Sequence, residues 1–166
     1  MQLDHYSTNF NKRTFPITLV CENVNNAPNV GSLFRTADAF GVSELIFCGK
    51  HIPLGRKMTK TSRATEKVVN YSISESSFDV VNKLKSQGYF VIALEITTNS
   101  KPLKLYTFPK NQSLALIIGD ENFGISEDIL GLCDEIIHID MYGQNSSMNV
   151  VQATSVALYE MTKQLK

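Results

Sequence analysis

Three short polar segments contain side chains that could build a chemical site, and the first of them spans residues 26–35 (NAPNVGSLFR). Arg35 offers a planar fork of donors that suits a phosphate or a ribose, and Gly31 would let a ligand or another backbone approach closely. The structural alternative is that Asn29 caps a helix and Arg35 pairs with Asp38. Because caps and such pairs are common, spacing alone favours the structural alternative.

The second segment, residues 118–126 (IGDENFGIS), follows the most hydrophobic run of the chain. Gly119 and Gly124 bracket Glu121, an arrangement that suits a tight loop against a flat ligand. The alternative is an ordinary strand-to-helix connection in which Ser126 caps the helix. The two interpretations carry equal weight, because folding rarely needs a carboxylate between two glycines.

The third segment, residues 142–149 (YGQNSSMN), is polar and leads directly into an apolar helical pattern. Ser147 or Asn149 could cap that helix. The same side chains, together with exposed backbone amides, could instead hold a ligand. Capping is the simpler interpretation of this segment taken by itself.

Basic residues are concentrated between positions 50 and 67, where six of the chain's 16 lysines and arginines accompany a single acid, Glu66. They are Lys50, Arg56, Lys57, Lys60, Arg63 and Lys67. A solvated loop would explain such a run, but a local positive field is also how a neutral protein binds nucleic acid. The chain has 16 basic and 16 acidic residues in all, which excludes a globally basic nucleic-acid binder.

Alternating strand-like and helix-like stretches must position these segments. Short apolar runs predict strands, and apolar residues at i, i+3, i+4 and i+7 predict helices. The predicted strands are residues 17–21, 44–48, 89–94, 114–118 and 135–139, and the predicted helices are 30–40, 78–86, a short one after 126, and 149–163. Apolar strands separated by helices predict an α/β fold with a parallel sheet covered on both faces.

The length of 166 residues is enough for a substantial core and predicts one domain over residues 1–166. In parallel sheets, ligands bind beyond the carboxyl ends of the strands. That rule directs attention to residues 23–31, 94–99, 119–126 and 141–149, which include the three polar segments.

Several other chemistries lack their sequence signatures. The chain has no Gly-x-Gly-x-x-Gly, Walker or Gly-x-Ser-x-Gly motif. His5, His51 and His138 stand apart and no Cys-x-x-Cys occurs, so no metal site is expected, and His138 is interpreted as structural. No apolar run approaches the roughly 18 residues of a membrane span, and the first residues do not resemble a signal peptide. Three scattered cysteines predict unpaired thiols in a cytoplasmic protein.

Taken together, the three segments resemble the three motifs of the SpoU (TrmH) family of SPOUT RNA methyltransferases, the third motif extending from Ile139 to Val150. The motifs agree in order, in spacing and in their position after strands. The resemblance implies transfer of a methyl group from S-adenosylmethionine to a ribose 2′-hydroxyl of tRNA or rRNA. It also implies a deep trefoil knot near the C-terminal end and an obligate homodimer.

The resemblance also implies residue roles. Gly119, Ile139 and Met148 look like cofactor contacts, and Leu94 is expected near the adenine. Arg35 looks like the residue that activates the ribose hydroxyl. The polar groups that position the site are expected to be Asn29, Glu121, Ser147 and Asn149.

The chain departs from the family pattern at a few positions, including Ala27, where proline is frequent, and Asp140, also frequently proline. No accessory RNA-binding domain is expected. The catalytic dimer itself would then hold the RNA, and the candidate contacts are Lys57, Lys60 and Arg63.

Two alternative functions remain open from the sequence. A non-catalytic homologue that binds RNA or nucleotides would keep the fold without its chemistry, although the intact motif residues argue against it. An ordinary flavodoxin-like nucleotide binder would be monomeric and unknotted, so a sizing column would separate it from a knotted dimer.

Overall fold

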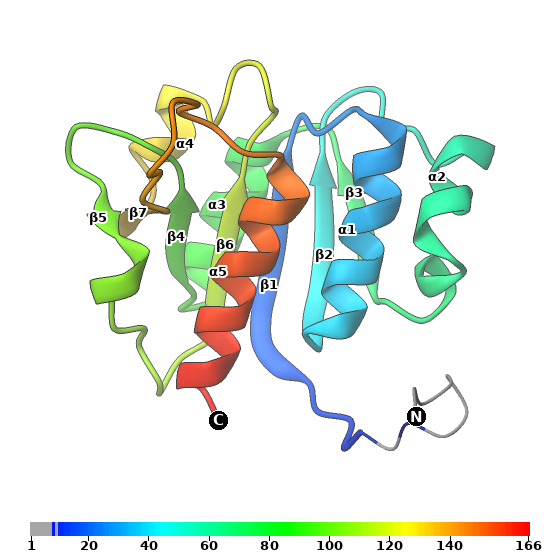
Figure 1. The fold of residues 1–166 in the computed structure, drawn as a ribbon, viewed down its shortest axis with the longest axis horizontal. Helices are drawn as coiled ribbons and strands as arrows, with labels where there is room; N and C mark the ends of the chain where they lie inside the picture. Colours follow the sequence, from blue (N-terminus) through cyan, green and yellow to red (C-terminus); the bar gives the residue numbers. More distant parts are fainter. Residues whose placement is uncertain (1–7, 9) are drawn as a thin grey trace.

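Seven strands form one sheet at the centre of the computed structural model, which describes residue 8 and residues 10–166 (Figure 1). Every neighbouring pair is parallel, and the order across the sheet is β3-β2-β1-β6-β4-β7-β5. The strands are β1 (Phe15–Glu22), β2 (Val42–Cys48), β3 (Tyr71–Ser74), β4 (Phe90–Leu94), β5 (Lys101–Pro102), β6 (Leu114–Ile118) and β7 (Glu135–His138). The helices are α1 (Ala27–Ala39), α2 (Arg56–Ser62), α3 (Ser77–Ser86), α4 (Glu127–Leu130) and α5 (Val150–Gln164), with short 3-10 helices η1 (Thr65–Lys67) and η2 (Leu103–Leu105).

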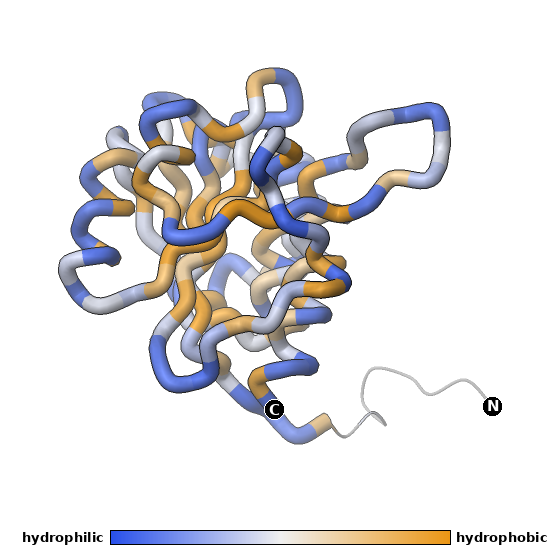
Figure 2. Tube along the Cα trace, turned by 90° about the vertical axis from the view of Figure 1, so that its left-hand side faces the viewer, coloured by the Kyte–Doolittle hydropathy of each residue, from blue (hydrophilic) through white to orange (hydrophobic). Residues whose placement is uncertain are grey.

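Helices cover both faces of this sheet, which confirms the predicted α/β architecture. Alternate strand residues point to opposite faces, so Leu19 of β1 packs with Leu33 of α1 and Leu158 of α5 on one side. Val20 packs with Val81 of α3 on the other side. Figure 1 shows α1 and α5 in front of the sheet with α3 behind it, and Figure 2 shows hydrophobic segments gathered at the sheet and hydrophilic segments in the surrounding connections.

The two strands that sequence periodicity does not predict lie at the two edges of the sheet. In β3, Tyr71 and Ile73 are exposed, and β5 contains only two residues, so neither has the apolar run of a central strand. Helix α2 is also unexpected, because it is basic and buries few side chains besides Met58. Local periodicity is too weak to reveal elements that bury so little.

Strand order brings distant connections together. The chain builds β1, β2 and β3 outward in one direction and then crosses to β4 on the other side of β1. Strand β6 later enters between β1 and β4, and β7 enters between β4 and β5. Because all strands are parallel, the connections that follow β1, β4, β6 and β7 meet at one edge of the sheet.

The cysteines are unpaired, as predicted. Burial, together with the charge of Glu22, raises the pKa of Cys48 to about 12. Within the described residues, no helix is both long enough and apolar enough to cross a membrane.

Gly31 allows α2 to pack directly on α1. A Cβ atom at this position would overlap the side-chain hydroxyl of Thr61 and the backbone carbonyl of Met58. Of the two uses expected for this glycine, approach of another backbone is therefore the one that the structure shows.

Replacing Gly31 with alanine should lower the free energy of unfolding by roughly 1–3 kcal/mol, because the added methyl group must push α2 away from α1. Urea unfolding followed by circular dichroism measures the effect. Gly143→Ala is a matched control, since nothing lies within 4 Å of a Cβ atom there. Equal unfolding midpoints for the two variants would contradict the packing argument.

Candidate functional site

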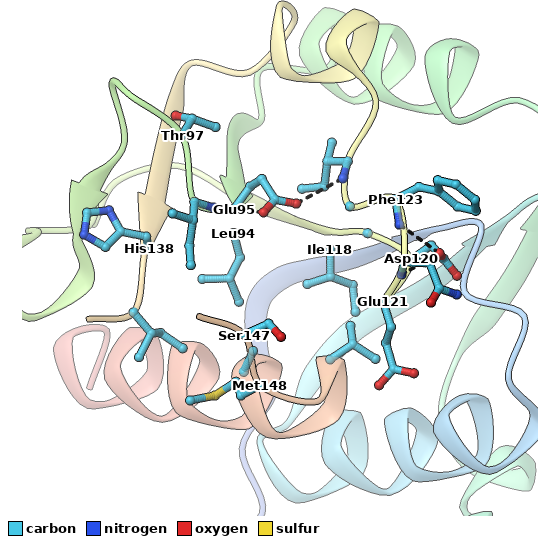
Figure 3. Close-up of a pocket in the computed structure, with 18 of the residues that line it drawn as sticks. Leu94, Glu95, Thr97, Ile118, Asp120, Glu121, Phe123, His138, Ser147 and Met148 are labelled. Carbon is cyan, nitrogen blue, oxygen red and sulfur yellow. Dashed lines mark hydrogen bonds between the residues drawn. The ribbon is translucent and has the colours of Figure 1, made fainter. Parts of the chain in front are cut away.

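A cavity of about 470 Å³ opens at the carboxyl edge of the sheet, between the connections that follow β4, β6 and β7 and the start of α5 (Figure 3). This volume is in the range of sites for small molecules and cofactors. The residues expected to contact a cofactor all line the cavity, and they are Leu94, Gly119, Ile139 and Met148. Apolar side chains from β4, β6 and α5 surround them, and polar groups converge from the connecting loops.

The loop after β6 folds back tightly on itself. The Gly124 amide donates to the Asp120 carbonyl at 2.8 Å, and the Asp120 carboxylate accepts from the amides of Asn122 (2.8 Å) and Phe123 (3.1 Å). A Cβ atom on Gly119 would overlap the Gly124 backbone, and Gly124 has a φ of +68°. The two glycines are therefore required by the tight loop, as their spacing predicts.

Two carboxylates that the sequence analysis did not single out hold the end of this loop. Glu22 is only 4% exposed and accepts from the Ser126 amide at 2.9 Å, the Ser126 hydroxyl at 2.8 Å and the Ser77 hydroxyl at 2.8 Å. Glu95 accepts from the amides of Ile125 at 3.1 Å and Ile96 at 2.9 Å. Their only sequence signal is a charged residue placed directly after an apolar strand.

The hydroxyl of Ser126 does not cap the helix, so that part of the structural alternative is wrong. Ser126 occupies the N-cap position of α4, but its side chain makes no capping hydrogen bond. It donates to Glu22 Oε1 at 2.8 Å, and a hydrogen bond to a carboxylate is stronger than one between neutral groups.

Asn149 joins the three polar segments. Its Nδ2 atom donates to Asn29 Oδ1 at 3.2 Å and to Glu121 Oε1 at 2.6 Å. Its Oδ1 atom accepts from the Val151 amide at 2.9 Å and so caps α5. The helix-cap interpretation of Asn149 is therefore confirmed, and its role as a site residue stays a prediction. Ser147 lines the cavity from the same loop, and its amide bonds Asn145 at 3.3 Å.

Helix α1 begins differently from the structural alternative. Asn26, not Asn29, caps the helix, because the Asn26 side chain accepts from the Asn29 amide at 3.2 Å. Asn29 is thereby free to face Asn149. The helix cap therefore lies three residues, about one helical turn, before the predicted position.

Arg35 lies apart from the cavity, on the exposed side of α1. Among the residues that the structure describes, its guanidinium makes no ion pair, so the predicted pairing with Asp38 is not formed. Of the predicted catalytic residues, Asn29, Glu121 and Asn149 are joined by hydrogen bonds and Ser147 lines the cavity, whereas Arg35 does neither.

The loop after β7 is anchored by Lys104. Its ammonium group contacts Asp140 at 3.1 Å and donates to the Tyr142 hydroxyl at 3.0 Å, and these bonds, led by the one to Tyr142, raise the pKa of Lys104. Asp140, a departure from the family pattern, thus has a local partner. His138 lines the cavity and its Nδ1 lies 2.9 Å from the Ser100 hydroxyl, so this residue belongs to the wall of the site.

The described residues contain no cluster of three or more side chains that could hold a metal ion, and His5 lies outside them. The basic stretch forms α2 and η1, and all six of its cations are exposed. Its acid, Glu66, accepts a hydrogen bond from the Ser62 hydroxyl, which lowers the pKa of Glu66. Lys57, Lys60 and Arg63 do not line the cavity.

Comparison with known proteins finds a matching family model, similar sequences and similar solved structures. The model of the SpoU rRNA Methylase family matches residues 16–159. The tRNA (guanosine(18)-2′-O)-methyltransferase of Escherichia coli K12 is 31% identical over 157 residues, which are 92% of this chain and 66% of that protein. The chain thus spans about two thirds of that relative's length.

Two solved structures share the fold. The A. aeolicus TrmH/SpoU tRNA modifying enzyme superposes with a TM-score of 0.82 and 27% identity, covering 92% of this chain and 77% of that one. The SpoU methyltransferase AviRb from Streptomyces viridochromogenes, solved in complex with the cofactor AdoMet, gives a TM-score of 0.80 at 23% identity over 97% of this chain and 64% of that one.

Replacing Asn149 with alanine should lower the free energy of unfolding by about 1 kcal/mol, because α5 loses its cap. Asn149→Ser should recover most of that stability, since a serine side chain also caps a helix, while still lacking the bond to Glu121. Urea unfolding of the two variants measures the difference. If serine were no better than alanine, capping would not be what Asn149 contributes to stability.

Proposed function

Because the chain belongs to the SpoU rRNA methylase family of S-adenosylmethionine-dependent RNA 2′-O-methyltransferases, we propose that it methylates a ribose 2′-hydroxyl of tRNA as a homodimer in the cytoplasm. The network around Asn149 carries the proposal: residues from all three motifs meet beside one cavity of cofactor size. The names of the E. coli and A. aeolicus relatives favour tRNA, and rRNA is the second substrate class.

The cavity suits the cofactor. Leu94, Ile139 and Met148 offer apolar surface for an adenine, and the tight loop at Gly119 presents backbone groups instead of side chains. The chain has no Gly-x-Gly-x-x-Gly motif, in agreement with a donor that carries no phosphate. When bound, S-adenosylmethionine supplies a methyl group already activated on a sulfonium.

The protein must mainly align the ribose hydroxyl and help it lose its proton. The Asn149 amide fixes Glu121 and Asn29, and these groups position the site. A guanidinium offers only donors and no acceptor, so Arg35 is a poor base. Its role in the proposal is to stabilise the developing alkoxide, or to hold an RNA phosphate that accepts the proton.

A homodimer explains why Arg35 stands outside the cavity of its own chain. Exposed residues of α5 recur along one face of the helix, where Val156 is 44% exposed and Tyr159 is 63% exposed. Helix α1, which carries Arg35, lies beside α5, and the Thr36 and Ser155 hydroxyls are 3.4 Å apart. A second copy packed on this surface would bring an arginine from α1 toward the site.

The proposal includes a trefoil knot at the C-terminal end. Its support is membership of the SpoU family, and the bond between Asn149 and Glu121 shows that the loops after β6 and β7 lie against each other.

Calorimetric titration with S-adenosylhomocysteine tests the function. The wild-type protein should bind about one molecule per subunit, and Arg35→Ala should bind it nearly as well, because Arg35 does not line the cavity. The same variant should lose methyl transfer to tRNA by a hundredfold or more, the order of a lost electrostatic contact to the transition state. Transfer is measured with a radiolabelled methyl donor and bulk tRNA.

Lost cofactor binding in Arg35→Ala would refute the assigned role of this arginine. Absence of binding by the wild-type protein, even with tRNA present, would favour the non-catalytic homologue instead.

Tyr159→Glu should convert the dimer into a monomer, because it places a charge on the exposed apolar face of α5. Gel filtration with light scattering measures the mass. Phe78→Glu, on the exposed side of α3, is the matched control and should stay dimeric. A monomeric wild-type protein would overturn the proposed assembly.

A further inference from the structure

A second cavity, of about 330 Å³, lies at the ends of β1, β2 and β3. It is lined by the connections that follow these strands, and the lining residues are Asn23, Asn25, Gly49, Lys50, His51, Ile52 and Glu75. None of the motif residues assigned above belongs to it. Because the sheet is parallel, this cavity opens on the same edge as the first one.

The lining is rich in unengaged donors. Lys50 carries a positive charge, His51 can carry one, and the amides of Asn23 and Asn25 add neutral N–H groups. Within the part of the chain that the structure describes, none of these four side chains has a hydrogen-bond or ion-pair partner. Such a set suits an anionic oxygen ligand such as a phosphate. Glu75 is the single acid in the lining.

Backbone hydrogen bonds hold the walls of this cavity in place. The Asn23 amide donates to the Cys48 carbonyl at 2.8 Å, and the Gly49 amide donates to the Ser74 carbonyl at 2.9 Å. Asn23 has a φ of 54° and Gly49 a φ of 144°, so both turns adopt conformations that favour glycine or asparagine. The three connections are therefore tied to one another before any ligand arrives.

The cavity also lies on a continuous route along the sheet edge. The connection from β1 to α1 contributes Asn23 and Asn25 to this cavity and then Asn26, which caps the helix that presents Asn29 to the site. On the other side, Lys50 begins the basic stretch that continues into α2 with Lys57 and Lys60. A nucleic-acid strand that follows this edge would pass the second cavity between the site and α2.

We propose that the second cavity binds a backbone phosphate of the RNA substrate, at a nucleotide flanking the one that is methylated. This inference rests on the proposed function, which supplies RNA as the ligand. The donors of the second cavity indicate where one of its phosphates binds. Lys50 and His51 attract the phosphate, the two asparagine amides donate to it, and Glu75 opposes it. Glu75 provides a second, independent test. Removing this acid should strengthen RNA binding, whereas removing a cation should weaken it.

Equilibrium binding of bulk tRNA, measured by filter retention over a series of salt concentrations, tests the proposal. Lys50→Met should weaken binding roughly fivefold and reduce the salt slope by about 0.7–0.9, as expected for one lost phosphate contact. His51→Asn should weaken it less. Glu75→Gln should tighten binding by a few fold, which a misfolded variant cannot do.

Lys110→Met is the matched control, because this exposed lysine precedes β6 and so lies at the opposite edge of the sheet. It should bind tRNA as the wild-type protein does. Inorganic phosphate, added at constant ionic strength, should weaken tRNA binding by no more than Lys50→Met does, since a single phosphate site contributes only part of the total affinity. Binding of inorganic phosphate that depends on Lys50 but leaves tRNA affinity unchanged would identify the cavity as a site for free phosphate and overturn the RNA assignment.

S-adenosylhomocysteine affinity, measured in parallel, distinguishes failure of the RNA contact at the second cavity from failure of the proposed function. If it is retained while Lys50→Met and Glu75→Gln bind tRNA as the control does, the second cavity is not an RNA site and the proposed function stands. If the wild-type protein binds neither tRNA nor S-adenosylhomocysteine, the proposed function fails and the inference fails with it.

Discussion

Two carboxylates fix the loop on which the site depends. Glu22 ends β1 and Glu95 follows β4, the two strands that flank β6, and they accept from the adjacent amides of Ser126 and Ile125. The loop that leaves β6 is therefore held from both sides. A buried amide left without its acceptor lowers the free energy of unfolding by about 1–3 kcal/mol. The two carboxylates, here called the Glu22 and Glu95 clamp, therefore strongly favour one loop conformation. The fixed loop conformation places Gly119 in the wall of the cavity and sets the position of Glu121.

The position of the clamp is a consequence of strand order. Strand β6 lies between β1 and β4, so its loop emerges between two strand ends that are far apart in the chain. Strand β7 then enters beside β4 and delivers the last polar loop against the same cavity. Parallel pairing places all of these ends at one edge, which is why the proposed cofactor site and the proposed RNA contacts share it.

Single residues at this edge of the sheet contribute both to stability and to the proposed function. Asn149 caps α5 with its oxygen and orients Asn29 and Glu121 with its nitrogen. Gly31, inside the first motif, serves the packing of α2 on α1, and α2 in turn carries the basic surface. The motif thus positions the proposed RNA-binding helix through packing as well as contributing Asn29 to the site. Arg35 is exposed and takes no part in the cavity or in the network around Asn149, which makes the second subunit part of the proposed chemistry.

The sequence by itself determined the α/β class, the central strands, the loops that build the site and the family, because these depend on local periodicity and on motifs with fixed spacing. The edge strands, α2, the Asn26 cap and the Glu22 and Glu95 clamp were decided only by the tertiary structure. The edge elements bury too little to leave a periodic signal. The clamp joins Glu22 to Ser126 across 104 positions, and a hydrogen bond over that separation exists only once the strand order has brought the two residues together.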